Sequence, residues 1–269
     1  MTFDHPRHVD PRNGERRYQY EPGAPTVVLL HGLTATPRQF DEFAPLLVKR
    51  GRNVLVPRLP KHGYHNRMTN ALADLELAEL IAAVKHALQE AHAWGSPVTV
   101  AGFSLGGLLS AYAAQREEVE RAVCIAPFLG IRWFPRAVNR SGSSVLKLFP
   151  DVFLWWNPMK RDGNGKRDGY PRYPISAVRK AYELASAVFE DARTRPPSAS
   201  SIAIVTNEGE STCHNGLARE LAQTWRDAGA TVEEHVLDLP PSHDFMTPRR
   251  GREQLRERAY PRLVEAIVV

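Results

Sequence analysis

Cysteine is scarce in this chain, because its 269 residues include only Cys124 and Cys213. Two cysteines are too few for a disulfide framework, and these two form no CxxC metal or redox pair, so a reducing compartment fits best. The apolar runs are short, and none approaches the roughly 20 residues that a membrane-spanning helix needs, so we expect no integral membrane association. Residues 1–20 are polar and lack the apolar stretch of a signal peptide. We therefore expect a cytoplasmic protein.

The chain also has no large excess of charge of one sign. The chain has 35 Lys and Arg against 30 Asp and Glu, which gives a formal net charge of +5. The basic residues are scattered or lie in two stretches, 159–172 and 249–258, which we interpret as a surface loop and the polar face of a terminal helix. No basic motif interleaved with aromatic residues accompanies them, so we expect no nucleic-acid partner.

Short apolar runs alternate with amphipathic ones along most of the chain. The apolar, β-branched runs predict buried strands at 26–30, 53–56, 97–101, 122–125, 201–206 and 231–237. The periodic runs predict helices from Thr36-Pro37 to near Gly51, and at 70–93, 108–114, 175–193, 217–228 and 253–267. Strands alternating with helices indicate an α/β fold, in which a mostly parallel sheet carries helices on both faces.

Residues 131–200 interrupt this alternation. The segment contains Trp133, Trp155 and Trp156, three of the five tryptophans. Long insertions in compact domains are usually lids or binding elements, so we expect a cap whose tryptophans bind substrate, although a surface excursion with its own small core is the alternative. The sequence therefore divides into an N-terminal extension (1–24), a core (25–130 and 201–269) and an inserted cap (131–200).

Residues 102–106, Gly-Phe-Ser-Leu-Gly, match the G-x-S-x-G pattern of a nucleophilic serine. The pattern requires a strand before it and a helix after it, and both are predicted here. The serine occupies a tight strand-to-helix turn, so the residues two positions before and after it must be small, as Gly102 and Gly106 are. We expect Ser104 to be the nucleophile.

The general base should follow the last strand and precede the final helix. His243 is the one histidine, among ten, at that position. The acid should lie in the loop after the strand at 201–206, where Glu208 and Glu210 are the candidates. Glutamate can orient and charge-stabilise an imidazole as aspartate does, although its extra methylene demands a shifted backbone. Asp244 adjoins His243 and is poorly placed to reach back to its ring.

Four segments carry a resemblance to a known family: HGLTATP (31–37), PRLPKHG (57–63), GFSLGG (102–107) and SHDF (242–245). They resemble the signatures of bacterial carboxylesterases and monoacylglycerol lipases of the α/β-hydrolase superfamily. The resemblance implies the α/β-hydrolase fold with an inserted cap, and it places the acid at Glu210. It also implies an oxyanion hole made by the backbone N–H groups of Leu33 and Leu105, the latter also expected as the residue after the nucleophile.

Other histidines are expected to have no catalytic role. His31 precedes Gly32 and is expected to shape that turn, and the resemblance makes His62 structural. His62 and His65 lie in a loop without a third ligand nearby, in surroundings that suggest solvent exposure, so no metal site is expected.

These residues together predict a serine hydrolase that cleaves a carboxylic ester through an acyl-enzyme intermediate and needs no cofactor. The partner is expected to be a small-molecule ester with an apolar acyl or aryl group. Two alternatives use the same fold: an acyltransferase with the same site, and a catalytically silent binding protein. Dehalogenase chemistry is disfavoured, since those relatives carry aspartate at the nucleophile position.

Overall fold

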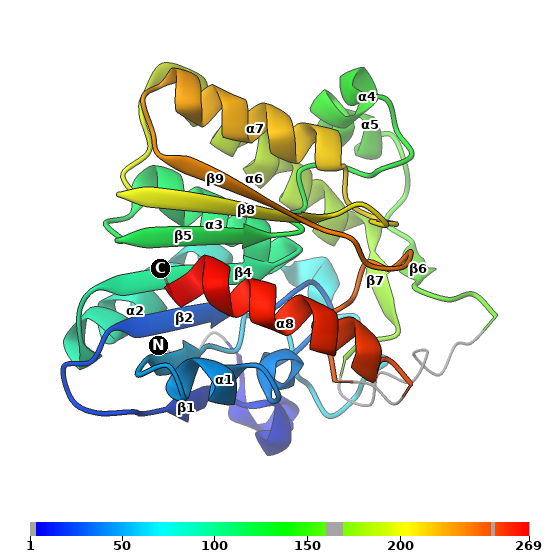
Figure 1. Ribbon diagram of the computed structural model, residues 1–269. Coiled ribbons are helices and arrows are strands. Elements are labelled where there is room, and N and C mark those ends of the chain that lie inside the picture. The colour runs from blue at the N-terminus through cyan, green and yellow to red at the C-terminus, as the bar shows by residue number, and fades with distance from the viewer. Residues whose placement is uncertain (1–3, 160–168, 249–250, 269) are drawn as a thin grey trace.

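A seven-stranded sheet forms the centre of the molecule in the computed structural model, which describes residues 4–159, 169–248 and 251–268 (Figure 1). The strand order is β1-β3-β2-β4-β5-β8-β9. Only β1 runs antiparallel to its neighbour, and the other neighbouring strands pair in parallel. The mostly parallel α/β architecture that the sequence predicts is therefore confirmed.

The strands of this sheet are β1 (Arg16–Tyr18), β2 (Thr26–Leu30), β3 (Asn53–Val56), β4 (Val98–Phe103), β5 (Arg121–Ile125), β8 (Ser201–Asn207) and β9 (Val232–Leu237). A separate two-stranded sheet pairs β6 (Phe153–Trp155) with β7 (Arg172–Pro174). The α-helices are α1 (Ala44–Val48), α2 (Leu77–Trp94), α3 (Leu105–Arg116), α4 (Arg136–Arg140), α5 (Gly142–Leu146), α6 (Ile175–Thr194), α7 (Asn215–Asp227) and α8 (Glu253–Val268). Short 3₁₀ helices occur at η1 (Pro6–His8), η2 (Pro11–Asn13), η3 (Pro37–Phe40) and η4 (Ala71–Asp74).

The central strands are apolar throughout because both faces of the sheet are covered. Successive side chains of a strand point to opposite faces. Along β2, Val28 and Leu30 belong to one core cluster, and Val27 and Leu29 belong to the other. Helices α2, α3, α6 and α7 contribute to the first cluster, whereas α1 and α8 contribute to the second. Figure 1 shows α8 lying across the face opposite α3.

Two of the predicted helices are interrupted. The run after Thr36 forms η3 and then α1 instead of one helix, and the Thr36 side chain makes no cap hydrogen bond. Pro45 explains this break, because a proline has no N–H and fits only the first turn of a helix. The helix predicted at 70–93 begins at Leu77, after η4 and an extended Leu75. Leu72 and Leu75 are buried in the core, and this tertiary packing overrides the local helical preference.

Residues 131–200 contain α4, α5, the two-stranded sheet and α6. Helix α6 packs on α3 and contributes apolar side chains, such as Leu184 and Val188, to the core that covers the main sheet.

The basic stretch 159–172 falls mainly on residues 160–168, which lie outside the described residues. The stretch 249–258 includes two more such residues, 249 and 250.

The N-terminal extension packs against the core. Strand β1 extends the main sheet at its edge, and the buried carboxylate of Asp4 accepts hydrogen bonds from Arg58 (2.6 Å) and Tyr64 (2.8 Å). Through the described parts of the chain, no helix has the length and apolar character needed to cross a membrane.

Candidate active site

Ser104 occupies the turn that joins β4 to α3. Its backbone has φ 58° and ψ −111°, a left-handed conformation that a non-glycine residue seldom adopts. Its N–H donates to Ile125 O at 2.9 Å, and its carbonyl accepts from the N–H groups of Leu108 and Phe128. These bonds to the neighbouring strand and to the helix stabilise the strained turn.

The two glycines around this serine allow the turn to form. A Cβ on Gly106 would lie 1.9 Å from Leu30 O, and a Cβ on Gly102 would lie 2.2 Å from Gly106 O. Real Cβ atoms do not approach backbone oxygens so closely. The strand and the helix thus come together at a distance that only glycine permits at these two positions.

His243 lies in the loop between β9 and α8, with its ring beside Ser104. Its Nε2 is 3.0 Å from Ser104 Oγ, and its Nδ1 is 2.9 Å from Glu210 Oε1. Because an ionised carboxylate only accepts hydrogen bonds, Nδ1 carries the proton, and Nε2 is left to accept one from the Ser104 hydroxyl. Phe103 packs against the imidazole, with 5.0 Å between the ring centroids.

Glu210 lies in the loop after β8 and is fully buried, whereas Glu208 in the same loop is exposed. Glu210 Oε1 also accepts hydrogen bonds from the backbone N–H groups of Thr212 (2.7 Å) and Cys213 (3.1 Å). The structure therefore brings Glu210, and not Glu208, to His243. Asp244 accepts from Thr247 instead of reaching back to the His243 ring.

Burial and neighbouring charges shift the pKa values of His243 and Glu210 in opposite directions. Burial by itself lowers the pKa of His243, but the neighbouring Cys213 and the Glu210 carboxylate raise it well above its ordinary value. Burial raises the pKa of the Cys213 thiol, so this group is uncharged at neutral pH and Glu210 is the effective partner there. Burial likewise raises the pKa of Glu210, but His243 and the two backbone N–H groups lower it below its ordinary value. The arrangement favours a Glu210 carboxylate beside an imidazole of raised basicity.

Leu33 and Leu105 line an apolar pocket together with Ser104. Leu33 follows β2 in the loop that begins at His31, and Leu105 is the first residue of α3. Within the described residues, neither N–H donates to any acceptor of the protein. Two such N–H groups near the nucleophile can stabilise an oxygen anion that develops there.

Gln39 and Thr34 connect these elements, and the sequence analysis did not identify either residue. Gln39 Oε1 accepts from the N–H of Gly32 at 2.9 Å, and its Nε2 donates to Thr247 Oγ1 at 3.1 Å. The glutamine therefore links the loop of Leu33 to the loop of His243. Thr34 has a φ of 64°, and its hydroxyl accepts from the Trp156 indole at 2.8 Å.

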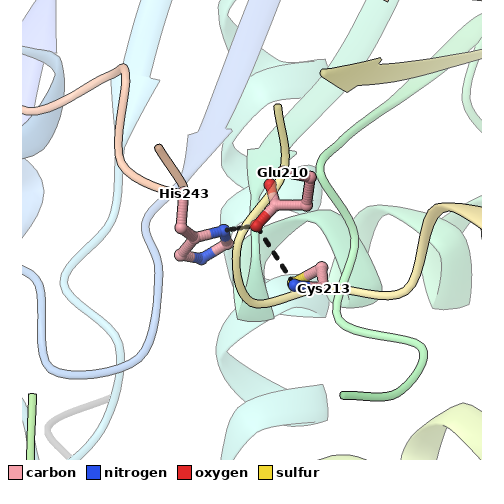
Figure 2. A group of neighbouring side chains, drawn as sticks. All are labelled: Glu210, Cys213 and His243. Atoms are coloured by element: carbon pink, nitrogen blue, oxygen red, sulfur yellow. Dashed lines mark hydrogen bonds and ion pairs between the residues drawn. The ribbon is translucent and has the colours of Figure 1, made fainter. Parts of the chain in front are cut away.

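Asn207 and Cys213 were also missed. Asn207 is buried at the end of β8, where its side chain accepts from the N–H of Leu239 and donates to the carbonyl of Ser242. It thereby joins the Glu210 loop to the His243 loop. Cys213 lies in the loop of Glu210, where its N–H donates to Glu210 Oε1 (Figure 2), and its Sγ lies within 4.8 Å of a ring nitrogen of His243. The position of Asn207 at the end of a strand and that of Cys213 in the loop of the acid could have indicated them. Their residue types alone did not.

Two pockets meet at Ser104. The first, of about 230 Å³, has a polar part lined by Gln39, Thr212, Ser242, Asp244 and Arg252. The second, of about 360 Å³, is mainly apolar, and the side chains that line it include Leu105, Phe128, Ile131, Leu146, Leu154 and Tyr173. Leu33 and Trp156 line both pockets together with Ser104.

The three tryptophans of the insertion lie in different surroundings. Trp156 is half-buried and lines both pockets, and Trp133 lines the apolar pocket although it is 74% exposed. Trp155 lies in β6 and is not among the residues that line either pocket. The insertion thus supplies one wall of the cleft at Ser104 through Trp156 and Trp133 together with apolar side chains such as Leu154.

His31 and His62 are both fully buried. His31 Nε2 accepts from the N–H of Leu59 at 3.1 Å, and its Nδ1 donates to Gly32 O at 3.0 Å. These bonds hold the turn before Leu33. The expectation that His62 is exposed is wrong, because its ring packs near His31 and Tyr170 and its Nδ1 donates to Pro60 O. His65 is exposed.

Comparisons with known proteins identify the family of this chain. Residues 27–267 match the sequence model of the alpha/beta hydrolase family. A thermostable monoacylglycerol lipase from a Bacillus species is 31% identical over 110 residues, which represent 38% of this chain and 40% of that relative. The alignment therefore spans less than half the length of that protein.

Solved structures show the same fold. A metagenome-derived lipolytic enzyme superposes with a TM-score of 0.70 at 17% identity, covering 96% of this chain and 99% of the other. The monoacylglycerol lipase of Paleococcus ferrophilus gives a TM-score of 0.64 at 17% identity, with 93% and 99% covered. A monoglyceride lipase from Saccharomyces cerevisiae, in complex with a substrate analogue, gives a TM-score of 0.68 at 10% identity, with 93% and 89% covered.

Proposed function

Because the chain belongs to the alpha/beta hydrolase family, we propose that it is a serine hydrolase that cleaves carboxylic esters through an acyl-enzyme intermediate. The observation that carries this proposal is the unbroken contact from Glu210 through His243 to Ser104, with 2.9 Å and 3.0 Å between the bonded atoms. Serine, histidine and a carboxylate in this order form the relay that activates a serine hydroxyl. The lipase names of the similar proteins support the same reaction class.

The first half of the reaction forms the acyl-enzyme. Ser104 Oγ attacks the ester carbonyl carbon while His243 Nε2 takes the hydroxyl proton. The carbonyl oxygen becomes an anion, and the N–H groups of Leu33 and Leu105 donate hydrogen bonds to it, each contributing roughly 10²–10³ in rate. When the tetrahedral intermediate collapses, the carbon–oxygen bond to the alcohol breaks and His243 gives its proton to the departing alkoxide.

The second half releases the acid. Water attacks the acyl carbon as His243 Nε2 accepts one of its protons, and Ser104 Oγ leaves and recovers that proton. Glu210 holds the imidazole in the required tautomer and stabilises it while it is positively charged. All of these roles belong to side chains and backbone groups of this chain, and the proposed reaction uses no cofactor.

The two pockets suggest how an ester lies at Ser104. We place the acyl group in the apolar pocket and the alcohol in the polar pocket, because burial of apolar surface stabilises binding by about 25 cal/mol per Å². In this proposal residues 131–200 form the cap on the core (25–130 and 201–269), and residues 1–24 precede it. Trp133 and Trp156 contribute to the cap's contacts with the acyl group, together with the other insertion residues that line this pocket.

A screen of p-nitrophenyl esters with increasing acyl length tests the proposal. The wild-type protein should release p-nitrophenol with a preference for acyl groups that fit the apolar pocket, and Ser104→Ala should be inactive on every ester. Analysis of the products with added alcohols distinguishes transfer to water from transfer to another acceptor. Turnover by a folded Ser104→Ala protein would refute the proposal.

A further inference from the structure

Three residues with chemically different metal-ligating groups lie close together next to Ser104. One ligand atom from each of Glu210, Cys213 and His243 lies within 4.8 Å of the other two (Figure 2). The relay uses Glu210 and His243, whereas the thiol of Cys213 has no part in it. Cys213 and Glu210 are buried, and the His243 side chain is 13% exposed.

The donor set indicates which cation this cluster would prefer. Imidazole nitrogen, thiolate sulfur and carboxylate oxygen are the ligands that zinc takes in proteins. A thiolate also favours thiophilic cations such as Zn²⁺ and Cd²⁺ over Mg²⁺ and Ca²⁺, which prefer oxygen. A divalent cation between one thiolate and one carboxylate carries no net charge, which lowers the free-energy cost of burying it.

The surroundings supply an entry path and a ligand oxygen. A cavity of about 430 Å³ is lined by Glu210 and Cys213 together with Arg132 and His214, and it shares no lining residue with the two pockets at Ser104. Glu210 Oε1 is held by the N–H groups of Thr212 and Cys213, whereas its buried Oε2 has no hydrogen-bond partner among the described residues. The carboxylate therefore keeps one oxygen, Oε2, that no hydrogen bond of the described residues occupies, while Oε1 keeps its backbone hydrogen bonds.

We propose that Glu210, Cys213 and His243 form an inhibitory site for a thiophilic divalent cation, with Zn²⁺ as the natural ligand. On binding, the Cys213 thiol loses its proton to solvent, and its sulfur binds the metal. His243 binds through Nδ1, so the ring proton moves from Nδ1 to Nε2. Water completes the coordination shell.

Inhibition follows from the position of that proton. An Nε2 that carries hydrogen no longer accepts the proton of Ser104, so the serine stays a neutral alcohol. The cation also separates Glu210 from Nδ1 and thereby removes the carboxylate from the relay. This consequence rests on the proposed function, whereas metal binding itself does not.

Cadmium tests the site without any hydrolysis. Cd²⁺ added to the wild-type protein should produce a thiolate-to-metal charge-transfer band in the ultraviolet that saturates at one ion per chain and disappears with EDTA. Cys213→Ser and Cys213→Ala should lack the band, whereas Cys124→Ser should keep it, because Cys124 lies in β5 outside the cluster. His243→Ala should keep the band but bind Cd²⁺ more weakly.

Zinc tests the consequence for turnover. Zn²⁺ should inhibit ester hydrolysis reversibly, and Cys213→Ser should raise the half-inhibitory concentration by at least about tenfold, since losing even an outer-shell partner costs roughly 10–100-fold in affinity. Equal inhibition of the wild type and a folded Cys213→Ser protein would overturn the proposal, as would a wild type without the cadmium band. A wild type that shows the band but hydrolyses no ester would contradict the proposed function and leave the metal site standing.

Discussion

His243 Nε2 lies 3.0 Å from Ser104 Oγ, although 139 positions separate the two residues in the chain. Ser104 follows β4 and His243 follows β9, with β5 and β8 between these strands in the sheet. Parallel strands end at one edge of a sheet, so the loops that follow them meet there. The contact pairs a hydroxyl of low intrinsic reactivity with an imidazole that can remove its proton.

Replacement of the acid should separate Glu210 from Glu208. Glu210→Gln should lower kcat by roughly 10⁴ with little loss of fold, because the amide carries no charge and favours the wrong histidine tautomer. Glu208→Gln is the matched control, since Glu208 is exposed and does not contact His243, and it should change kcat little. Measured kcat values in the reverse order would assign the acid to Glu208.

The pH profile should report the raised pKa of His243. The base must be neutral to accept a proton, so kcat/KM should rise with pH as His243 loses its own proton. Burial lowers this pKa, but Cys213 and Glu210 together raise it, so the midpoint of the acidic limb should lie above the ordinary histidine value of 6.5. In Glu210→Gln the residual activity should show a lower midpoint. A midpoint that this substitution does not move would exclude Glu210 as the cause.

Gln39 should position the loop that contains Gly32 and Leu33. Gln39→Met leaves the buried N–H of Gly32 without its acceptor, which should cost about 1–3 kcal/mol of unfolding free energy and also lower kcat. Gln115→Met is a matched control, because buried Gln115 makes comparable bonds to Arg195, Pro196 and Trp225 away from Ser104. Denaturant unfolding should show similar losses for both variants, and kinetics should show a fall in kcat for Gln39→Met alone. Equal kcat for the two variants would leave Gln39 with a purely structural role.

Trp156 should set the preference for acyl length. Trp156→Ala opens the apolar pocket and should change the ratio of kcat/KM between short and medium acyl esters, whereas Trp156→Phe should preserve that ratio because it keeps an aromatic ring. Trp155→Ala is the neighbouring control and should alter the ratio less. A uniform fall for all chain lengths in Trp156→Ala would mean that its hydrogen bond to Thr34, and not pocket shape, is what matters.

Much of the fold could be predicted because parallel strands buried on both faces must be apolar throughout. Strands β2 and β3 begin and end at the predicted residues. The helices were harder, because tertiary packing of Leu72 and Leu75 and the proline at position 45 decide where the helical segments break. Strand β1 was missed because RRY at 16–18 is polar and lies at the sheet edge, where it pairs only with β3.

The site could be predicted where chain order and motif context restrict the choice. Ser104 follows from its glycines, and His243 from its place between the last strand and the last helix. Chain order and motifs do not indicate the direction in which a side chain points. The sequence therefore did not distinguish Trp156 from Trp155 as a pocket residue. Links such as Gln39 to Gly32 depend on loops meeting in space, and no local pattern indicates them.

Covalent labelling by a fluorophosphonate tests the central claim most directly, because only an activated serine reacts readily with it. We expect one probe per chain, attached to Ser104 as shown by mass spectrometry of the digested protein, with loss of turnover in proportion to labelling. Ser104→Ala should take up no probe, and its turnover should fall by about 10⁶. Stoichiometric labelling that persists in the folded Ser104→Ala protein, or that maps to another residue in the wild type, would contradict the account.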